Sequence, residues 1–151
     1  MRDIVVRRAR VDESDAAAAL FRLSKETAMS YLPDLHTRDE DRAYLRERVF
    51  ATCEVWVAER YGELAGICAF REGWIDHLYV HPEHLRTGIG AALLRKAKDA
   101  NDRLQLWTFQ RNENARAFYE SQGFQMVKTT AGRDNEEQEP DALYAWTRTG
   151  L

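Results

Sequence analysis

The stretch HPEHLRTGIGAALL, residues 81–94, places Gly88 and Gly90 between two apolar patterns of different period. Residues 73–80 (GWIDHLYV) predict a strand before it, and a helical pattern follows it. Glycines at a helix start let a ligand approach the backbone, and the free N–H groups there attract anions. A phosphate site and an ordinary strand-to-helix turn both fit this spacing.

Two well-known phosphate-binding patterns do not match the glycine turn. A P-loop requires Lys and then Ser or Thr after its second glycine, where this chain has two alanines. A dinucleotide fingerprint requires Gly or Ala three positions after Gly90, where Leu93 stands. If the turn binds phosphate, it does so through backbone N–H groups and needs no metal; we call this arrangement a backbone cradle. Arg86 and Thr87 would add a cation and a hydroxyl donor to it.

The whole chain has the length and composition of one globular domain. Its 151 residues are 44% hydrophobic, which predicts a single domain over residues 1–151. The net charge of −3 argues against nucleic acid as a partner. No apolar run approaches the roughly 20 residues that span a bilayer, the N-terminus lacks a signal-peptide core, and two cysteines are too few for a disulfide framework. We therefore expect a cytoplasmic protein without a membrane partner.

Periodicity along the chain predicts the order β-α-α-β-β-β-α-β-α-β-β. Thr37 with Glu40 has the spacing of a capping box for the second helix, and Asp12 or Ser14 is expected to cap the first. This order predicts an α/β (mixed α+β) fold with a central mixed, mostly antiparallel, twisted sheet and helices on both faces. The predicted strands are residues 4–10, 54–60, 64–71, 73–80, 104–109, 123–130 and 142–148; the helices are residues 16–29, 37–50, the glycine turn to about residue 100, and 112–122.

A second motif gives the glycine turn a ligand. Residues 112–124, NENARAFYESQGF, follow the turn by about thirty residues. Together the two segments resemble the GNAT superfamily of acyl-CoA-dependent N-acetyltransferases, which carries Q/R-x-x-G-x-G/A after its fourth strand and N-x-x-A-x-x-x-Y-x-x-x-G-F near its C-terminal end. The motifs span residues 75–124, and the predicted order of elements fits the family fold. One position departs from the pattern, because Leu85 stands where the family has Gln or Arg.

The resemblance implies acetyl-CoA as cosubstrate and no metal. It assigns the pantetheine arm to the strand of Leu78, Tyr79 and Val80, with the amide near Val80 polarising the thioester carbonyl as an oxyanion donor must. Asn112 would contact the arm from the other side. The diphosphate would be held by Arg86, Thr87, Gly88, Ile89, Gly90 and Ala91.

The resemblance further implies direct attack of an acceptor amine on the thioester. Tyr119 matches the family tyrosine that protonates the departing thiolate, although a packed helix aromatic would fit the same position. Neutralising an alkylammonium of pKa near 10.4 at pH 7 costs roughly 4–5 kcal/mol, so a base is useful. His77 and Asp76 are the candidates; strand alternation predicts that they point to opposite faces, so that at most one faces the acceptor.

We therefore expect an N-acetyltransferase that acts on a primary amine of a small molecule, peptide or protein, with a homodimer allowed. In the family fold the acceptor groove corresponds to residues 29–38 and 132–141. The second segment carries five acidic residues, which suit a cationic amine but also a solvated loop. The alternative function is a non-catalytic acyl-CoA-binding or sensor domain of the same fold.

Overall fold

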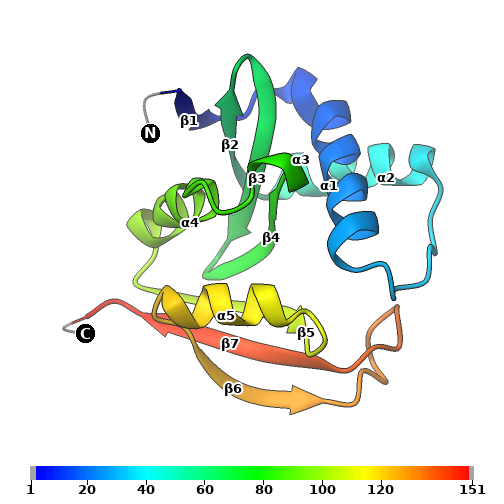
Figure 1. The fold of residues 1–151 in the computed structure, drawn as a ribbon, viewed down its shortest axis with the longest axis vertical. Helices are drawn as coiled ribbons and strands as arrows, with labels where there is room; N and C mark the ends of the chain where they lie inside the picture. Colours follow the sequence, from blue (N-terminus) through cyan, green and yellow to red (C-terminus); the bar gives the residue numbers. More distant parts are fainter. Residues whose placement is uncertain (1–2, 150–151) are drawn as a thin grey trace.

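The computed structural model of the protein describes residues 3–149, in which seven strands form one twisted sheet with helices on both faces (Figure 1). The strand order is β1-β2-β3-β4-β5-β7-β6, and every neighbouring pair is antiparallel except β4 with β5. The predicted mixed, mostly antiparallel sheet and the predicted order of elements are confirmed.

The bounds of most elements agree with the periodicity to within two residues. Along the chain they are β1 (Ile4–Arg8), η1 (Val11–Glu13), α1 (Ser14–Ala28), α2 (Arg38–Tyr44), η2 (Leu45–Val49), α3 (Phe50–Thr52), β2 (Glu54–Arg60), β3 (Glu63–Arg71), β4 (Trp74–Val80), η3 (Pro82–His84), α4 (Ile89–Ala100), β5 (Arg103–Phe109), α5 (Glu113–Ser121), β6 (Gln125–Thr130) and β7 (Asp141–Thr147).

The first two helices start in different ways. At α2 the Thr37 hydroxyl accepts a hydrogen bond from the Glu40 N–H, and the Glu40 carboxylate accepts one from the Thr37 N–H, so the predicted capping box is confirmed. At α1 the N-cap is Glu13, and the prediction of Asp12 or Ser14 is wrong. The reason is the 3-10 turn η1, which takes up the residues before the helix and leaves Glu13 at its start.

The sheet separates two apolar cores, and β3 contributes to both. Ile67 and Ala69 pack with α1 and η2 on one face, whereas Cys68 and Phe70 pack with α4 on the other. Side chains that alternate along a strand point to opposite faces of the sheet, which explains why the β3 sequence is apolar almost throughout. A central strand buried on both faces therefore fixes the positions of its neighbours β2 and β4.

The junction between β4 and β5 divides the sheet into two parts. Within the described residues these strands are joined by one register pair, Trp74 with Gln105, and the Gln105 N–H donates to the Gly73 carbonyl at 2.8 Å. Beyond that pair the strands separate, and β5 leads away together with β7 and β6 (Figure 1). The carboxyl end of β4 consequently has β3 on one edge and no strand on the other.

Candidate active site

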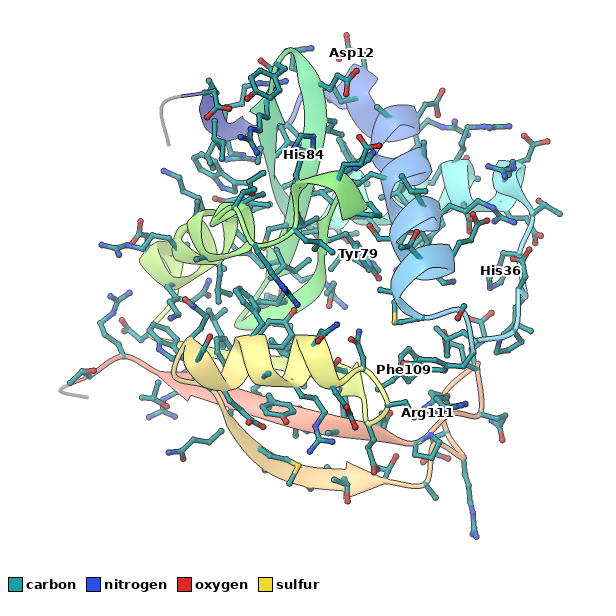
Figure 2. All side chains as sticks on the ribbon, in the orientation of Figure 1. Asp12, His36, Tyr79, His84, Phe109 and Arg111 are labelled. Atoms are coloured by element: carbon teal, nitrogen blue, oxygen red, sulfur yellow. The ribbon has the colours of Figure 1, made fainter. Side chains whose placement is uncertain are left out.

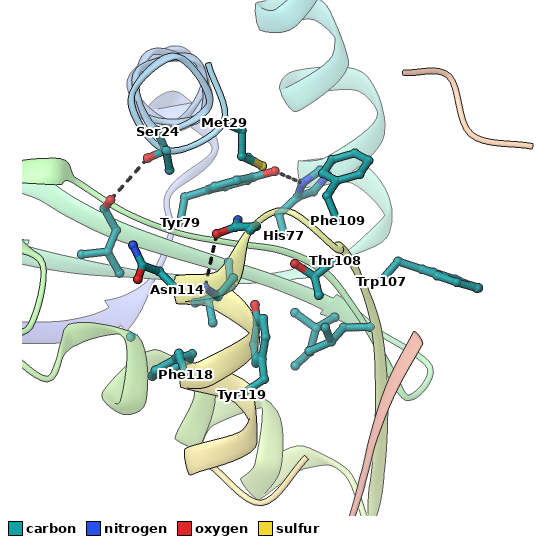
Figure 3. A pocket seen from close by; sticks show the side chains of 18 of the residues that line it. Ser24, Met29, His77, Tyr79, Trp107, Thr108, Phe109, Asn114, Phe118 and Tyr119 are labelled. Carbon is teal, nitrogen blue, oxygen red and sulfur yellow. Dashed lines mark hydrogen bonds between the residues drawn. The ribbon is translucent and has the colours of Figure 1, made fainter. Parts of the chain in front are cut away.

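A cleft of about 1180 Å³ lies where β4 and β5 separate, between β4, the start of α4, β5 and α5 (Figure 3). We call it the main cleft. It is lined by every predicted site residue except Thr87, that is by Asp76, His77, Leu78, Tyr79, Val80, Arg86, Gly88, Ile89, Gly90, Ala91, Asn112 and Tyr119. Residues from two distant motifs are thus brought to one cavity.

The free edge of β4 presents backbone polar groups to the main cleft. The His81 N–H donates to the Ala65 carbonyl of β3 at 2.8 Å. Because hydrogen-bonded and non-bonded pairs alternate in an antiparallel ladder, the peptide groups of Leu78 and Val80 point away from β3 and into the cleft. The Val80 carbonyl accepts a hydrogen bond from the Ser24 hydroxyl of α1 at 3.3 Å, which ties this edge to the helix (Figure 3).

The start of α4 supplies N–H groups without helical partners. Gly88 is the N-cap in the left-handed region (φ 86°), and the first intrahelical bond runs from the Ala92 N–H to the Gly88 carbonyl. The N–H groups of Ile89, Gly90 and Ala91 precede that bond, so they are free to bind an anion at the positive end of the helix dipole. The glycine turn therefore has the geometry of an anion cradle.

Three neighbours of the cradle have distinct surroundings. The Thr87 hydroxyl donates to the His84 carbonyl at 2.5 Å, so this proton is used within the loop and is not free for a ligand. Arg86 is exposed at the mouth of the cleft with φ 62°. Leu85, which replaces the Gln or Arg of the motif, is 56% exposed and also lies at the mouth.

The α5 helix closes the main cleft from the other side. Asn112 caps the helix by accepting a hydrogen bond from the Ala115 N–H at 3.2 Å, which leaves its amide N–H groups free to donate. Tyr119 is 8% exposed, packs against Phe118 and Phe124, and points its hydroxyl into the cleft (Figure 3). Burial raises the pKa of Tyr119 far above its ordinary value, so at neutral pH its hydroxyl is protonated and can donate a proton.

A β-bulge brings Asp76 and His77 to the same side of the sheet. The β3–β4 register passes from Ile75 directly to His77 and leaves Asp76 unpaired. Asp76 then accepts a hydrogen bond from the Cys53 thiol at 3.4 Å, and His77 Nε2 lies 2.9 Å from the Tyr44 hydroxyl. The prediction that the two side chains point to opposite faces is wrong, because alternation fails at a bulge.

The two candidate bases differ in their electrostatics. Burial lowers the pKa of His77 to about 4, so its imidazole is neutral at pH 7. Asp76 accepts a hydrogen bond from Arg71 Nε at 2.7 Å, which offsets its negative charge. His77 Nδ1 also lies 3.4 Å from the Tyr79 hydroxyl, so both ring nitrogens of His77 face tyrosines.

A smaller cavity of about 430 Å³ adjoins the main cleft, and we call it the side pocket. The two cavities share Met29, Asp76, His77, Tyr79, Trp107 and Phe109. The side pocket extends outward between α1, α2 and the β6–β7 loop, where its lining consists of Phe21, Lys25, Leu32, His36, Glu40, Asp41, Tyr44, Glu136 and Glu137.

Contacts through Arg111 and between His36 and Glu136 join residues 29–38 to residues 132–141, and His36 and Glu136 line the side pocket. Arg111 binds the buried Glu139 carboxylate through two hydrogen bonds of 2.7 and 2.6 Å, and its guanidinium lies 4.2 Å from the centre of the Tyr31 ring. His36, which is labelled in Figure 2, pairs with Glu136. The predicted acceptor segments, residues 29–38 and 132–141, are therefore in contact with each other.

Sequence reasoning missed several residues of these cavities. Ser24 holds the β4 edge, and Phe21 and Tyr44 form walls of the side pocket. Ser24 carries a detectable signal, since it is a polar residue on the apolar stripe of α1. The lining role of Tyr44 follows from how α2 lies over the β4 bulge, which the sequence pattern does not reveal.

No helix among residues 3–149 has the length and apolar character needed to cross a membrane. In the same part of the chain, no group of three or more His, Cys, Asp or Glu side chains is arranged to hold a metal ion.

Comparison with known proteins identifies similar chains. Residues 51–126 match the family model described as "Acetyltransferase (GNAT) domain". The peptidyl-lysine N-acetyltransferase YiaC of Escherichia coli (strain K12) is 32% identical over 103 residues, which are 68% of this chain and 69% of that protein.

Two solved structures share the fold. The apo-form of YjaB from Escherichia coli superposes with a TM-score of 0.79 at 22% identity, covering 97% of this chain and 99% of its own. YncA from Salmonella typhimurium, solved with its cofactor acetyl-CoA, superposes with a TM-score of 0.73 at 17% identity, covering 95% of this chain and 93% of its own.

The lowered pKa of His77 predicts a pH dependence of stability. Between pH 6.5 and about 4 the unfolded chain binds a proton at this residue and the folded chain does not, so folding stability falls as the pH falls through this window. Wild type should lose free energy of unfolding between pH 7 and pH 4, and we expect this loss to be about 1–3 kcal/mol smaller in His77→Phe. Urea unfolding at both pH values measures it. Equal losses in the two proteins would contradict the burial of a neutral imidazole.

Proposed function

Because the chain belongs to the GNAT acetyltransferase family, we propose that it transfers the acetyl group of acetyl-CoA to a primary amine, with residues 1–151 forming one catalytic domain. The observation that carries this proposal is the convergence of three features on the main cleft. These are the free peptide groups of β4, the unpaired N–H groups of α4 and the protonated hydroxyl of Tyr119. A thioester with a diphosphate and an amide-containing arm matches all three.

The residues of the cleft suit the parts of acetyl-CoA in turn. The N–H groups of Ile89, Gly90 and Ala91 would hold the diphosphate, and the peptide groups of Leu78 would hydrogen-bond the pantetheine arm. The peptide groups of Tyr79, which the sequence also assigned to the arm, are directed to β3 and are not available for it. Acetyl-CoA supplies the acyl group as an activated thioester. The acetyl-CoA complex of YncA, which has the same fold, supports this choice of cosubstrate.

Backbone and side chain would then stabilise the charge that develops in the reaction. The Val80 N–H would donate to the carbonyl oxygen of the thioester as that oxygen becomes negative. Tyr119 lines the cleft and would give its proton to the sulfur as the thiolate leaves; its raised pKa keeps the hydroxyl protonated until then but also makes it a weaker acid than an exposed tyrosine. Asn112 would orient the arm through its free amide N–H groups.

The acceptor must lose a proton, and the two predicted bases have different surroundings. The pKa of His77 is lowered to about 4 by burial, and the charge of Asp76 is offset by Arg71. We propose that these groups accept hydrogen bonds from the amine at the junction of the two cavities, where both lie. The rate would then follow the fraction of acceptor that is already neutral.

The relative YiaC is named for peptidyl-lysine, which suggests a lysine side chain as acceptor for this chain too. Release of free thiol from acetyl-CoA, measured against a panel of lysine peptides, polyamines, amino acids and aminoglycosides, tests the proposal. Thiol release with at least one amine supports it. Binding of acetyl-CoA without thiol release from any amine would indicate the non-catalytic sensor function instead.

Loss of the Tyr119 hydroxyl should slow turnover. We expect Tyr119→Phe to lower kcat by about 10- to 1000-fold, because the leaving thiolate would no longer receive a proton from the enzyme. The dissociation constant of acetyl-CoA, measured by calorimetry, should change little. Tyr61→Phe is the matched control, since Tyr61 is 74% exposed in the β2–β3 turn. An unchanged kcat in Tyr119→Phe would contradict the assigned role.

A negative side chain in the cradle should prevent cosubstrate binding. We expect Gly88→Glu to abolish measurable acetyl-CoA binding in calorimetry, because the carboxylate would repel the diphosphate and the side chain would strain a left-handed position. Gly62→Glu is the control, since Gly62 also has a positive φ (77°) and lies in the β2–β3 turn with open space around it. Retained affinity in Gly88→Glu would exclude this turn as the diphosphate site.

A further inference from the structure

The side pocket has an aromatic wall. The ring centroids of Phe21 and Tyr79 are 5.1 Å apart, and those of Phe21 and Tyr44 are 6.4 Å apart. The Lys25 ammonium already lies 4.9 Å from the centre of the Phe21 ring. Aromatic faces attract cations at such distances, so the Phe21 ring already binds a cation of the protein itself.

Most carboxylates around the side pocket are already bound within the protein. Asp41 pairs with Arg22 at 2.5 Å, Asp76 pairs with Arg71, Glu136 pairs with His36, and the Glu40 carboxylate accepts a hydrogen bond from the Thr37 N–H. Lys25 is the remaining charged group of the lining besides Glu137. The negative charges of these four carboxylates are therefore balanced within the protein, without any ligand.

Glu137 is different from these four carboxylates. Within residues 3–149 its side chain forms no hydrogen bond and no ion pair, although the residue is partly buried and lines the side pocket. It lies near Tyr79, whose pKa is raised by burial and, to a smaller extent, by the negative charges of neighbours that include Glu137. A partly buried carboxylate without a partner leaves a negative charge in the lining that the aromatic residues share.

The loop around Glu137 is held in place by its neighbours. The Asn135 side chain donates to the Glu139 carbonyl at 2.7 Å and accepts from the Glu139 N–H at 3.1 Å. The Glu139 carboxylate is bound by Arg111. A Cβ atom at Gly132 would lie 2.1 Å from the Glu139 carbonyl oxygen, so the two ends of the loop are packed tightly together. Glu137 is therefore presented by a fixed turn.

A carboxylate without a cationic partner beside the reacting nitrogen would stabilise the ammonium form and oppose attack on the thioester, whereas the charge of Asp76 at the junction is offset by Arg71. Glu137 belongs to the outer lining, whereas the junction with the main cleft is formed by other residues, among them His77 and Tyr79. We propose that Glu137 binds a second positive charge of the acceptor on the outer side of the Tyr79 ring, while the reacting amine lies at the junction beside His77. This specificity rests on the proposed acetyl transfer and selects acceptors that carry two cationic groups.

Two amines of nearly equal size test the selection. 1,4-Diaminobutane and 1-aminopentane differ in having an ammonium or a methyl group at the far end. We expect wild type to have a higher kcat/KM for the diamine than for 1-aminopentane. Glu137→Gln should lower kcat/KM for the diamine about tenfold. Its kcat/KM for 1-aminopentane and its KM for acetyl-CoA should stay within about twofold of wild type. Glu63→Gln, an exposed carboxylate outside both cavities, should change none of these values.

Lysine peptides distinguish the source of the second charge. N-acetyl-Lys-Lys-amide and N-acetyl-Lys-norleucine-amide carry the same reacting side chain and differ in the charge of the neighbouring one. In each pair, the ratio of kcat/KM for the doubly charged compound to that for the singly charged one is compared between wild type and Glu137→Gln. If Glu137→Gln lowers this ratio more for the peptides than for the alkylamines, the second charge belongs to a peptide. If it lowers the ratio more for the alkylamines, the second charge belongs to a polyamine. Equal ratios for wild type and Glu137→Gln in both pairs would overturn the proposal.

Direct binding separates this inference from the proposed function. Calorimetric titration of 1,4-diaminobutane and 1-aminopentane into the protein loaded with coenzyme A requires no turnover. Tighter binding of the diamine that is lost in Glu137→Gln supports the pocket even if no amine is acetylated, in which case only the transfer reaction fails. Equal binding of the two amines, or no binding of either, would overturn the role of Glu137 even if acetylation of other amines is observed.

Discussion

The arrangement of this protein depends on one constraint, the brief pairing of β4 with β5. The strands are joined at Trp74 and Gln105 and then separate, although both belong to the same sheet. A strand that continues beyond its partner leaves peptide N–H and C=O groups without a ladder partner, and such groups are costly to bury unless something else binds them. The Ser24 hydroxyl binds the Val80 carbonyl, and we infer that a ligand with amide groups binds the rest.

The remaining walls of the main cleft fit around this edge. Residue 90 is a glycine at a place where a Cβ atom would lie 3.2 Å from the Phe118 ring, so α4 and α5 approach each other closely at the base of the cleft. That approach brings the positive end of α4 to one side and Tyr119 to the other. Anion binding and proton donation are thereby placed along one continuous cavity, which is the arrangement that acyl transfer from a charged thioester needs.

The sequence predicted the elements well because strand and helix periods are local properties. The glycine turn, the α5 motif and the capping box of α2 were located correctly for the same reason. Two features were missed because they depend on tertiary structure. The bulge at Asp76 turns it to the same side as His77, and it appears only when the β3–β4 register is known. The glutamates of the β6–β7 loop have partners that are distant in sequence, because Glu136 pairs with His36 and Glu139 pairs with Arg111.

Amide hydrogen exchange measured by NMR tests whether the free backbone groups of β4 and α4 bind acetyl-CoA. We expect acetyl-CoA to slow exchange at Leu78, Val80 and the first three residues of α4, Ile89, Gly90 and Ala91. Tyr79 should change little, because the ladder directs its N–H to β3 in the free protein. Unchanged exchange at Leu78, Val80 and the α4 amides, while binding is saturated, would contradict the account.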